Sequence, residues 1–265
     1  MSPAPRVDFL GSILSRKRAE VADRQRQVPL EQLLAAPRGR PVPSFHGALS
    51  RRGQSPRVIA EVKRRSPSAG VLADLDAEVI GRRYAQAGAA AISVLTDGPG
   101  FGGDLEDLRV VSAAVRTPTL RKDFLVDRYQ VEEARAAGAS AVLLIVAALT
   151  PPQLEGLLRS AQEAGLDALV EVHDRAELEV ALAAGAKIIG INNRNLRTFV
   201  VDLQTSVALL PSIPDDRLAV VESGVRDLED VRRLRDAGAA NFLIGEALVR
   251  AADPGALVEA IGALR

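Results

Sequence analysis

Charged side chains that can donate or accept protons follow several short apolar runs of this sequence. The segments IAEVKRRSPSAG, TLRKDF, LVEVHD and VVESGV contain Glu61, Lys63, Lys122, Glu171 and Glu222. Lysine ammonium groups can donate protons and carboxylates can accept them, so this set suits general acid–base catalysis. A charge in a buried strand is costly unless it is paired or functional. A structural ion pair would explain one such residue, but their recurrence favours a catalytic site.

Lysine is rare in this chain, which uses arginine for nearly every other positive charge. Of the 34 basic residues, the lysines are Lys17, Lys63, Lys122 and Lys187. Arginine stays protonated, whereas the pKa of a lysine can be moved by its surroundings. A retained lysine therefore suggests a site that titrates, although residual lysines would explain so small a number as well. We expect Lys17, on an N-terminal helix, and Lys187, at the start of a strand, to face solvent.

A weak internal repeat predicts the elements that position these residues. A helical stretch, an Ala-Gly-Ala or related triplet and a short apolar run recur along the chain. The repeated glycines are Gly88, Gly138, Gly165, Gly185 and Gly238. Each stands where a helix would end in the left-handed conformation. Each apolar run is too short for a helix and lacks alternation, which is typical of a parallel strand buried on both faces.

Extending this repeat predicts eight strands separated by amphipathic helices. The strands are expected at 58–62, 90–95, 118–121, 141–146, 168–172, 187–192, 218–222 and 241–244. Helices are expected at 105–115, 128–137, 152–164, 176–184 and 228–237, and their starts are signalled by Asp127, Thr150, Asp174 and Asp227. Eight such units predict an α/β fold, the (β/α)8 or TIM barrel. A doubly wound open sheet is the alternative, but it rarely needs eight regular units.

The first 56 residues do not follow the repeat. They contain one amphipathic stretch near 8–24 and a Pro/Gly/Arg-rich stretch at 37–56. We expect residues 1–56 to form an N-terminal helical extension that packs on a catalytic barrel of residues 57–265, within a single domain. A floppy tail is the alternative.

In a barrel of this kind the active site lies at the C-terminal ends of the strands. The unusual polar residues of this sequence follow the predicted strands at that end. Besides the lysines and glutamates above, they are Ser66, Asp123, His173, Asn192 and Arg194. His173 has no second histidine nearby in the sequence, so we expect it to support the site or the fold rather than to bind a metal.

A phosphate site is predicted after the last two strands. Ser223 and Gly224 follow the seventh strand, and Gly245 and Glu246 follow the eighth. Backbone N–H groups and a short helix N-terminus at these positions of a barrel bind phosphate dianions. Ser66, in the loop after the first strand, could add a hydroxyl group from the other side.

Composition excludes several classes of function. Lys+Arg and Asp+Glu both number 34, so the net charge of zero exerts no general attraction to nucleic acid or to anionic membrane. Cysteine is absent and His46 and His173 are the histidines, which excludes disulfides, thiolate catalysis and Cys- or multi-His metal sites. The longest apolar run, 141–149, is about half of what a membrane helix needs, and the N-terminus lacks a secretory pattern. We expect a cytoplasmic protein with no metal and no nucleic-acid or membrane partner.

The motifs of the chain, taken in order, resemble those of the indole-3-glycerol-phosphate synthase family of tryptophan biosynthesis. They are IAEVKRRSPSAG, SVLTDGPGFGG, RKDF, LVEVH, IGINNRNL, ESGV and FLIGEAL, and the resemblance covers nearly the whole chain. It implies a lyase that converts 1-(2-carboxyphenylamino)-1-deoxyribulose 5-phosphate into indole-3-glycerol phosphate. The reaction comprises ring closure, decarboxylation and dehydration, and it needs no cofactor. We expect a monomer or weak oligomer.

The resemblance also implies roles for the charged residues. Lys122 would protonate the ketone during ring closure. Glu171 would be the carboxylate nearest the proton that leaves the ring nitrogen during dehydration. Lys63 would contact the carboxylate or phosphate end of the substrate, with a later proton transfer also open to it. Glu61 and Glu222 would hold the lysine charges and bind substrate hydroxyls.

Substrate contacts follow in the same way. Asn192 and Arg194 resemble polar residues that orient the substrate and the loop after the sixth strand. The apolar pocket for the anthranilate ring would comprise Phe101, Leu120, Phe124, Leu143, Leu196 and Ile244. For Leu120 and Leu143, ordinary barrel core is an equally good interpretation. Glu246 stands where some relatives have serine beside the phosphate, so its backbone N–H would have to make that contact.

Three alternatives to this function can be compared with the residues. Phosphoribosylanthranilate isomerase resembles this chain in its barrel and phosphate site, but it uses a catalytic cysteine, which is absent here. A sugar-phosphate isomerase could use Glu61 and Glu171 as opposed carboxylates, but would leave both active-site lysines unexplained. A binding or scaffold barrel would need the phosphate site alone and not the acid–base set.

Overall fold

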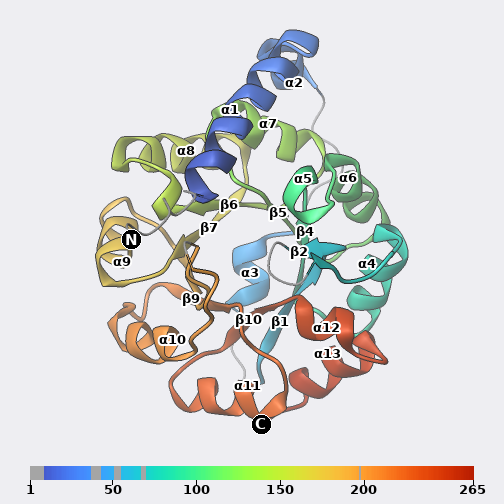
Figure 1. Cartoon of the computed structure of the whole chain (residues 1–265), viewed down its shortest axis with the longest axis vertical. Helices are drawn as coiled ribbons and strands as arrows, with labels where there is room; N and C mark the ends of the chain where they lie inside the picture. The colour runs from blue at the N-terminus through green and yellow to red at the C-terminus, as the bar shows by residue number, and fades with distance from the viewer. Residues whose placement is uncertain (1–8, 37–42, 51–54, 67–69, 197) are drawn as a thin grey trace, which may run out of the picture.

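The apolar runs of the repeat form the strands of a closed barrel (Figure 1). The computed structural model describes residues 9–36, 43–50, 55–66, 70–196 and 198–265. Within these residues, eight parallel strands close in the order β1-β10-β9-β8-β7-β6-β5-β4. The predicted (β/α)8 barrel is confirmed, and the open-sheet alternative is wrong because β1 pairs with both β4 and β10.

The observed strands agree with the predicted ones to within one residue at each end. They are β1 (Arg57–Val62), β4 (Ala91–Leu95), β5 (Thr119–Lys122), β6 (Ala141–Ile145), β7 (Asp167–Val172), β8 (Ile188–Asn192), β9 (Leu218–Glu222) and β10 (Asn241–Ile244). A small antiparallel pair, β2 (Arg65–Ser66) and β3 (Gly70–Val71), lies outside the barrel in the loop after β1. This pair was not predicted, since two-residue strands leave no pattern in a sequence.

Helices surround the barrel between successive strands (Figure 1). They are α4 (Ala77–Gln86), α6 (Leu105–Ala114), α7 (Arg128–Ala136), α8 (Pro151–Ala164), α9 (Arg175–Ala183), α10 (Gln204–Leu209), α11 (Leu228–Asp236) and α13 (Pro254–Gly262). Short helical turns add α5 (Gly98–Phe101), α12 (Glu246–Arg250), η1 (Val146–Ala148) and η2 (Leu210–Ser212). The predicted helix starts are confirmed, because the N-caps include Asp127, Thr150, Asp174 and Asp227. All five glycines of the repeat have positive φ.

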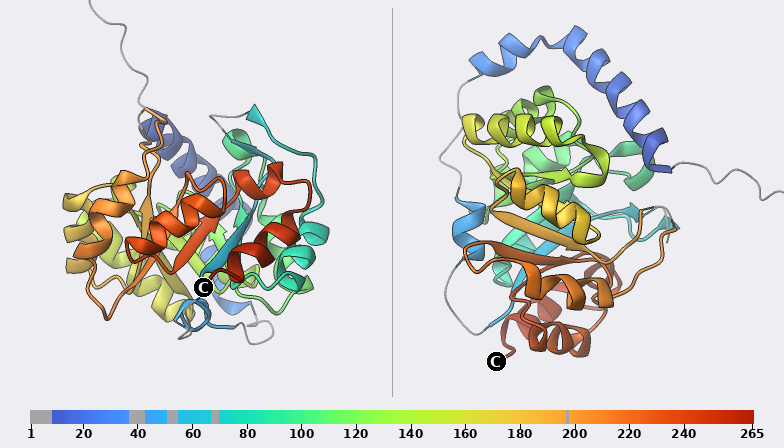
Figure 2. Two further views of the ribbon diagram at one scale, coloured as in Figure 1. Left: turned by 90° about the horizontal axis from the view of Figure 1, so that it is seen from below. Right: turned by 90° about the vertical axis from the view of Figure 1, so that its left-hand side faces the viewer.

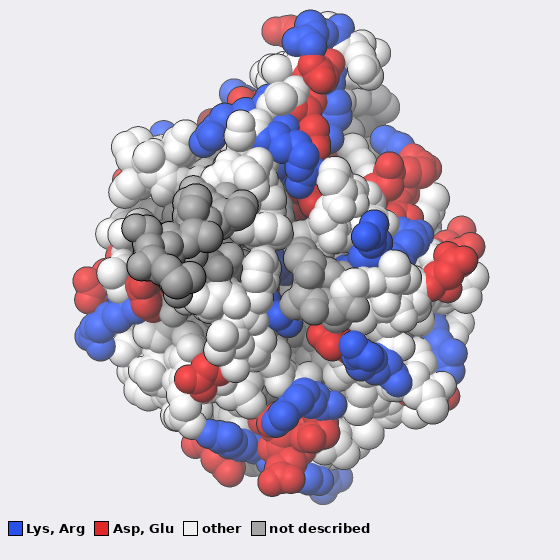
Figure 3. Space-filling view, in the orientation of Figure 1, with Lys and Arg blue, Asp and Glu red and all other residues white. Residues whose placement is uncertain are grey.

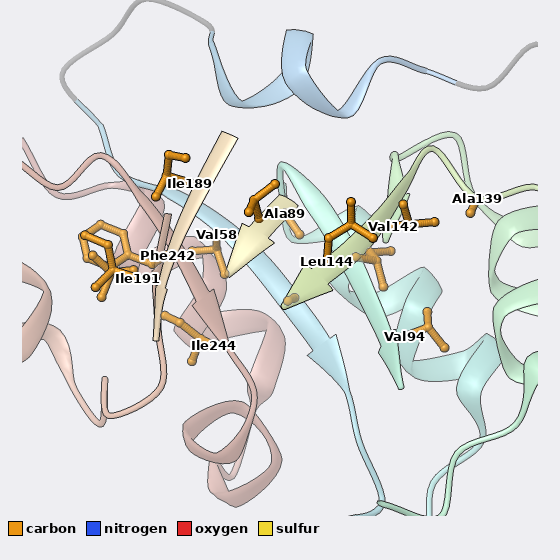
Figure 4. Packing of buried hydrophobic residues seen from close by; sticks show 14 of the residues in the cluster. Val58, Ala89, Val94, Ala139, Val142, Leu144, Ile189, Ile191, Phe242 and Ile244 are labelled. Atoms are coloured by element: carbon orange, nitrogen blue, oxygen red, sulfur yellow. The ribbon is translucent and has the colours of Figure 1, made fainter. Parts of the chain in front are cut away.

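Side chains alternate along each strand between the barrel interior and the surrounding helices. Val58, Val142 and Phe242 point outward and pack beneath the helices (Figure 4). Ile59 and Leu169 point inward and pack with other strand residues in the barrel interior. This alternation decides which charged residues of the strand ends face the mouth of the barrel.

The N-terminal extension packs on the barrel at both of its ends. Helix α1 (Phe9–Gln27) is followed by α2 (Leu30–Ala35), and α1 crosses the rim near η1 and α7 (Figures 1 and 2). Helix α3 (Phe45–Leu49) lies at the opposite end, where Phe45 and Leu49 are buried in the interior cluster. Of the predicted extension, residues 1–8, 37–42 and 51–54 lie outside the described residues.

No helix of the described residues is long and apolar enough to cross a membrane. On the face seen in Figure 3, acidic and basic side chains are interspersed around the rim. The described surface on this face therefore presents no large field of one sign.

Candidate active site

A cavity of about 870 Å³ opens at the C-terminal ends of the strands. The six residues predicted to be catalytic all line it: Glu61, Lys63, Lys122, Glu171, Asn192 and Glu222. Each of these residues occupies the last inward-facing position of its strand, except Lys63, which directly follows β1. Inward positions recur every second residue, so these side chains face the same cavity. The structure thus brings together charges that the sequence spreads over 160 residues.

The ammonium group of Lys122 lies between two carboxylates from different strands. Its Nζ is 3.3 Å from Glu171 Oε2 and 3.5 Å from Glu222 Oε2. Burial opposes the charge on Lys122, but Glu171, Glu222 and Glu61 outweigh it and raise the pKa of Lys122 above its ordinary value. Lys122 is therefore protonated at neutral pH and can donate a proton into the cavity.

The pKa values of the two carboxyl groups beside Lys122 are shifted in opposite directions. Burial would raise the pKa of Glu171, but Lys122 and His173 outweigh it and hold that pKa well below its ordinary value. Burial also acts on Glu222, which lacks a compensating hydrogen bond from a described side chain. Burial and the charges of Glu171 and Glu61 raise the pKa of Glu222 to about 8, against the opposing effect of Lys122. At neutral pH one carboxyl is ionised and the other holds a proton.

Two neighbours orient the Glu171 carboxylate. Asn192 Nδ2 donates a hydrogen bond of 3.0 Å to Glu171 Oε1. His173 lies between Glu171 and Glu177, with Nε2 3.4 Å from Glu171 and Nδ1 2.9 Å from Glu177. Burial lowers the pKa of His173, but the two glutamates outweigh it and raise that pKa to about 10. The imidazolium supports Glu171 from outside the cavity, as expected for a supporting residue.

A second ion pair lies on the other side of the mouth. Lys63 Nζ is 2.5 Å from Glu61 Oε1. Glu61 lies in β1, and Lys63 is the first residue after that strand. Gly245, at the end of β10, leaves the space for this pair, since a Cβ there would overlap Glu61 Oε1 and lie 3.0 Å from Lys63 Nζ. Gly190 on β8 leaves space for Glu222 in the same way.

The loops after β9 and β10 form a backbone cradle. Ser223 and Gly224 have φ of 63° and 88°, so consecutive residues adopt the left-handed conformation beside the cavity. Successive N–H groups in such turns form anion-binding nests. Gly245 is the N-cap residue of α12, and the Glu246 side chain turns to Arg250, 3.0 Å away. The backbone N–H of Glu246 is thus free of competition from its own carboxylate.

Apolar side chains line another wall of the cavity. Phe101 and Phe124 have ring centroids 6.2 Å apart, and Leu196, Leu143 and Ile244 also line the cavity. Leu120 is fully buried in the interior cluster and does not line it, which favours ordinary core for that residue. The Ser66 side chain lies outside the described part of the structure.

The loop between β8 and α10 closes over this wall. Arg194 forms a β-bridge with Val201, and its Nη1 donates to the Phe199 carbonyl at 3.3 Å. Phe199 has φ of 59° and packs edge-on against Phe9 of α1, with centroids 4.8 Å apart. Sequence reasoning missed Phe9 and Phe199 as cavity residues, because neither lies in a strand-end motif.

The expectation that Lys17 faces solvent is wrong. It is 1% exposed, and its Nζ lies 2.7 Å from Asp97 Oδ1 and 2.8 Å from Asp123 Oδ1. The amphipathic pattern of α1 could not reveal this, since it does not say which polar residue meets the barrel rim. Lys187 is exposed, as predicted. Among the described residues, no group of three or more His, Asp or Glu side chains is arranged so that it could hold a metal ion.

Known proteins include relatives that are similar to this chain over nearly its whole length. The sequence model of the family described as "Indole-3-glycerol phosphate synthase" matches residues 10–261. A protein of Nocardioides sp. named indole-3-glycerol phosphate synthase is 51% identical over 254 residues, which cover 94% of this chain and 95% of that protein. A protein of Syntrophobacter fumaroxidans with the same name is 49% identical over 256 residues, covering 95% and 96%.

Solved structures add a likeness in fold. The 3-hexulose-6-phosphate synthase from Salmonella typhimurium superposes with a TM-score of 0.63 at 15% identity, covering 78% of this chain and 96% of that one. At this identity the likeness concerns the barrel fold alone.

Proposed function

The chain belongs to the indole-3-glycerol phosphate synthase family, and on that premise we propose how the charges at the mouth of its barrel carry out the family's reaction. The chain is a carbon–carbon lyase of tryptophan biosynthesis. It converts 1-(2-carboxyphenylamino)-1-deoxyribulose 5-phosphate into indole-3-glycerol phosphate, carbon dioxide and water. The observation that carries the residue roles is the Lys122 ammonium, held between an ionised and a protonated carboxyl group in one cavity.

The two ends of the substrate are bound by different walls of the cavity. The phosphate is accepted by the backbone cradle of Ser223, Gly224 and Gly245, where N–H groups and the start of α12 favour an anion. The anthranilate ring packs against Phe101 and Phe124. With its two ends bound in this way, the substrate would have its ketone between them, within reach of the charged cluster. Leu196 and Arg194 close the loop side of the pocket.

Lys122 acts as the acid of ring closure. The ring carbon that bears the carboxylate attacks the ketone carbon, and Lys122 delivers a proton to the ketone oxygen as it becomes a hydroxyl group. The carboxylate then leaves as carbon dioxide, and its bonding electrons restore the aromatic ring. Glu171 and Glu61 hold the lysine charged until this step. Lys63, paired with Glu61, neutralises the substrate carboxylate before it leaves.

Glu171 acts as the base of dehydration. The hydroxyl group formed in the first step takes a proton from Lys63 and leaves as water, and a second proton is lost from the new five-membered ring. Glu171 is ionised at neutral pH and held in place by Asn192, so it can accept that proton. Glu222 is protonated at neutral pH and can donate a hydrogen bond to a substrate hydroxyl. These roles give a task to each of the six residues predicted to be catalytic.

Fluorescence tests the reaction directly. The chain contains no tryptophan, so an indole signal is easily distinguished from the protein. Purified protein with the substrate should release indole-3-glycerol phosphate and carbon dioxide in equal amounts, and a chelator should leave the rate unchanged. No indole signal from the folded protein would overturn the proposed function.

The proposal extends to the setting in which the enzyme works. We place it in the cytoplasm, acting on a small sugar phosphate that carries an anthranilate group, as a monomer or weak oligomer. Its balanced charge offers no general attraction to nucleic acid or to an anionic membrane. Sedimentation over a range of protein concentrations tests the oligomeric part of this proposal, which a stable tetramer would overturn.

A further inference from the structure

Lys17 of the N-terminal extension is a buried charge that the reaction described above does not use. Its ammonium lies 2.7 Å from Asp97, 2.8 Å from Asp123 and 3.2 Å from Glu20. An ammonium has three N–H donors, and these three acceptors match that number. Burial opposes the charge of Lys17, but Asp123 and Asp97 outweigh it and raise its pKa. Lys17 is therefore charged at neutral pH and can donate to all three acceptors.

The two aspartates belong to different walls of the active site. Asp123 directly follows Lys122 on the chain, and its Oδ1 also accepts the backbone N–H of Phe124 at 2.8 Å. Asp97 is the N-cap of α5, the helical turn that ends in Phe101. A single ammonium thus joins the end of the acid-bearing strand β5 to the turn that presents an aromatic ring to the cavity.

Further hydrogen bonds connect the Asp123 carboxylate to the end of β4 and to the outer face of β5. Asp123 Oδ2 accepts bonds from Thr96 at 2.7 Å and from Arg121 at 3.1 Å. Arg121 is fully buried on the outer face of β5 and pairs with Glu133 of α7. Asp123 is only 3% exposed, so solvent has little access to replace a lost partner.

We propose that Lys17 is a positioning residue for the reaction: by joining Asp97 to Asp123 across the β4 and β5 ends, it sets the spacing between Phe101 and Lys122. The inference rests on the proposed roles of those two residues. It gives the N-terminal extension a part in catalysis as well as in stability. It also accounts for a lysine in an arginine-rich chain by its compact, three-donor head group rather than by titration.

Lys17→Met tests the proposal, since methionine fills similar space without the charge. At a temperature where the variant is folded by circular dichroism, kcat should fall by about 10- to 100-fold, the scale expected when a reacting group is displaced by an ångström. The acid limb of the kcat–pH profile should also move to higher pH. The reason is that Lys17 and Arg121 keep the pKa of Asp123 far below its ordinary value, and one of these cations is gone.

Tyr129→Phe is the matched control. Tyr129 Oη donates to the carbonyls of Arg24 and Val28 near the other end of α1, at 3.2 and 3.0 Å, and it does not line the cavity. This variant should lower the melting temperature but leave kcat, KM and the pH profile within about twofold of wild type, as expected for loss of a remote hydrogen bond. Comparison of Lys17→Met with Tyr129→Phe therefore distinguishes the anchoring of α1 on the barrel from the positioning of the active-site residues.

Asp97→Asn tests the contact between Lys17 and Asp97, and this test does not depend on whether Lys17→Met folds. The carboxylate uses Oδ1 for Lys17 and Oδ2 for Gly100, whereas an amide has one acceptor oxygen and therefore keeps one of these contacts and loses the other. We expect KM to rise several-fold with kcat less affected, because the change loosens Phe101 rather than Lys122.

Wild-type kcat, KM and pH profile in Asp97→Asn and in folded Lys17→Met would reduce Lys17 to a structural anchor. The same holds if Tyr129→Phe loses as much kcat as Lys17→Met. An inactive wild-type protein would instead overturn the proposed function and leave the Lys17 contacts as they are.

Discussion

The carboxylate of Glu61 occupies the space that a side chain on Gly245 would fill. These two residues come from β1 and β10, the strands at which the barrel closes, and their backbones are paired one residue earlier, at Ala60 and Ile244. The Glu61–Lys63 ion pair can therefore lie beside the closure of the barrel because Gly245 has no side chain.

Gly245→Ala should disable the site without unfolding the barrel. The new methyl group overlaps Glu61 and touches Lys63, so the ion pair must move away from the cavity. We expect kcat/KM to fall at least about tenfold, since displaced catalytic groups lose this much or more. Gly262→Ala, where a Cβ meets open space, is the control and should keep wild-type kinetics. Normal activity of Gly245→Ala would mean that Glu61 has no fixed position in catalysis.

Lys122→Arg should lose far more activity than a substitution that keeps the charge normally does. A guanidinium stays protonated and is a poor proton donor, and general acid catalysis is worth about 10² to 10⁴ in rate. The measurement is kcat, together with the affinity for a substrate analogue whose ketone has been reduced. If kcat stays within a few-fold of wild type at equal affinity, Lys122 is not the acid.

Glu171→Gln should stall the reaction after ring closure. The amide still fills the space beside Asn192 and Lys122 but cannot accept the proton lost during dehydration. In a single turnover, carbon dioxide release should proceed while indole formation lags. Equal slowing of both signals would show that Glu171 positions the substrate or Lys122, and the base would then be sought at Lys63 or Glu61.

Glu222 should make the stability of the protein depend on pH. Its pKa is raised to about 8 in the folded chain from an ordinary value of 4.5, so between these values the folded state holds a proton that the unfolded state releases. Stability is thus highest, in this respect, below pH 4.5 and is lost as the pH rises towards 8. Glu222→Gln resembles the protonated form, so urea unfolding should give similar stabilities below pH 4.5 and a wild type that becomes progressively less stable than the variant as the pH rises towards 8. The exposed Glu179→Gln should give a constant difference.

Inorganic phosphate should compete with the substrate at the cradle after β9 and β10. Gly224→Ala should weaken this inhibition, because its φ of 88° disfavours alanine and the Cβ would lie 2.6 Å from Val201. Phosphate that inhibits wild type and the variant equally would place the anion site elsewhere on the barrel.

The barrel could be predicted from the sequence because its signals are local and repeated. Each turn of the repeat marks a helix end with a glycine such as Gly138 and follows it with an apolar run. The same runs predict the inward residues, since Glu171 and Glu222 lie two residues beyond buried Leu169 and Val220. Position along a strand was enough to predict which residues lie at the mouth of the barrel.

The contacts that cross between distant elements could not be predicted. Lys17 and Phe9 reach the site from α1, and nothing in their local sequence says that α1 lies against the β4 and β5 ends. The opposite titration of Glu171 and Glu222 depends on which carboxylate receives hydrogen bonds, and only Glu171 does so among the described side chains. These properties follow from distances and burial rather than from residue type.

The pairing of β1 with β10 also has a consequence for synthesis on the ribosome. Glu61 and Lys63 are made early, yet the strand that supports them is among the last to emerge. A nascent chain that ends before Asn241 leaves β1 and β9 as unpaired edges, so the mouth is incomplete until translation has nearly finished. A circular permutant that begins at α11 would translate β10 and β1 consecutively and could complete this seam first.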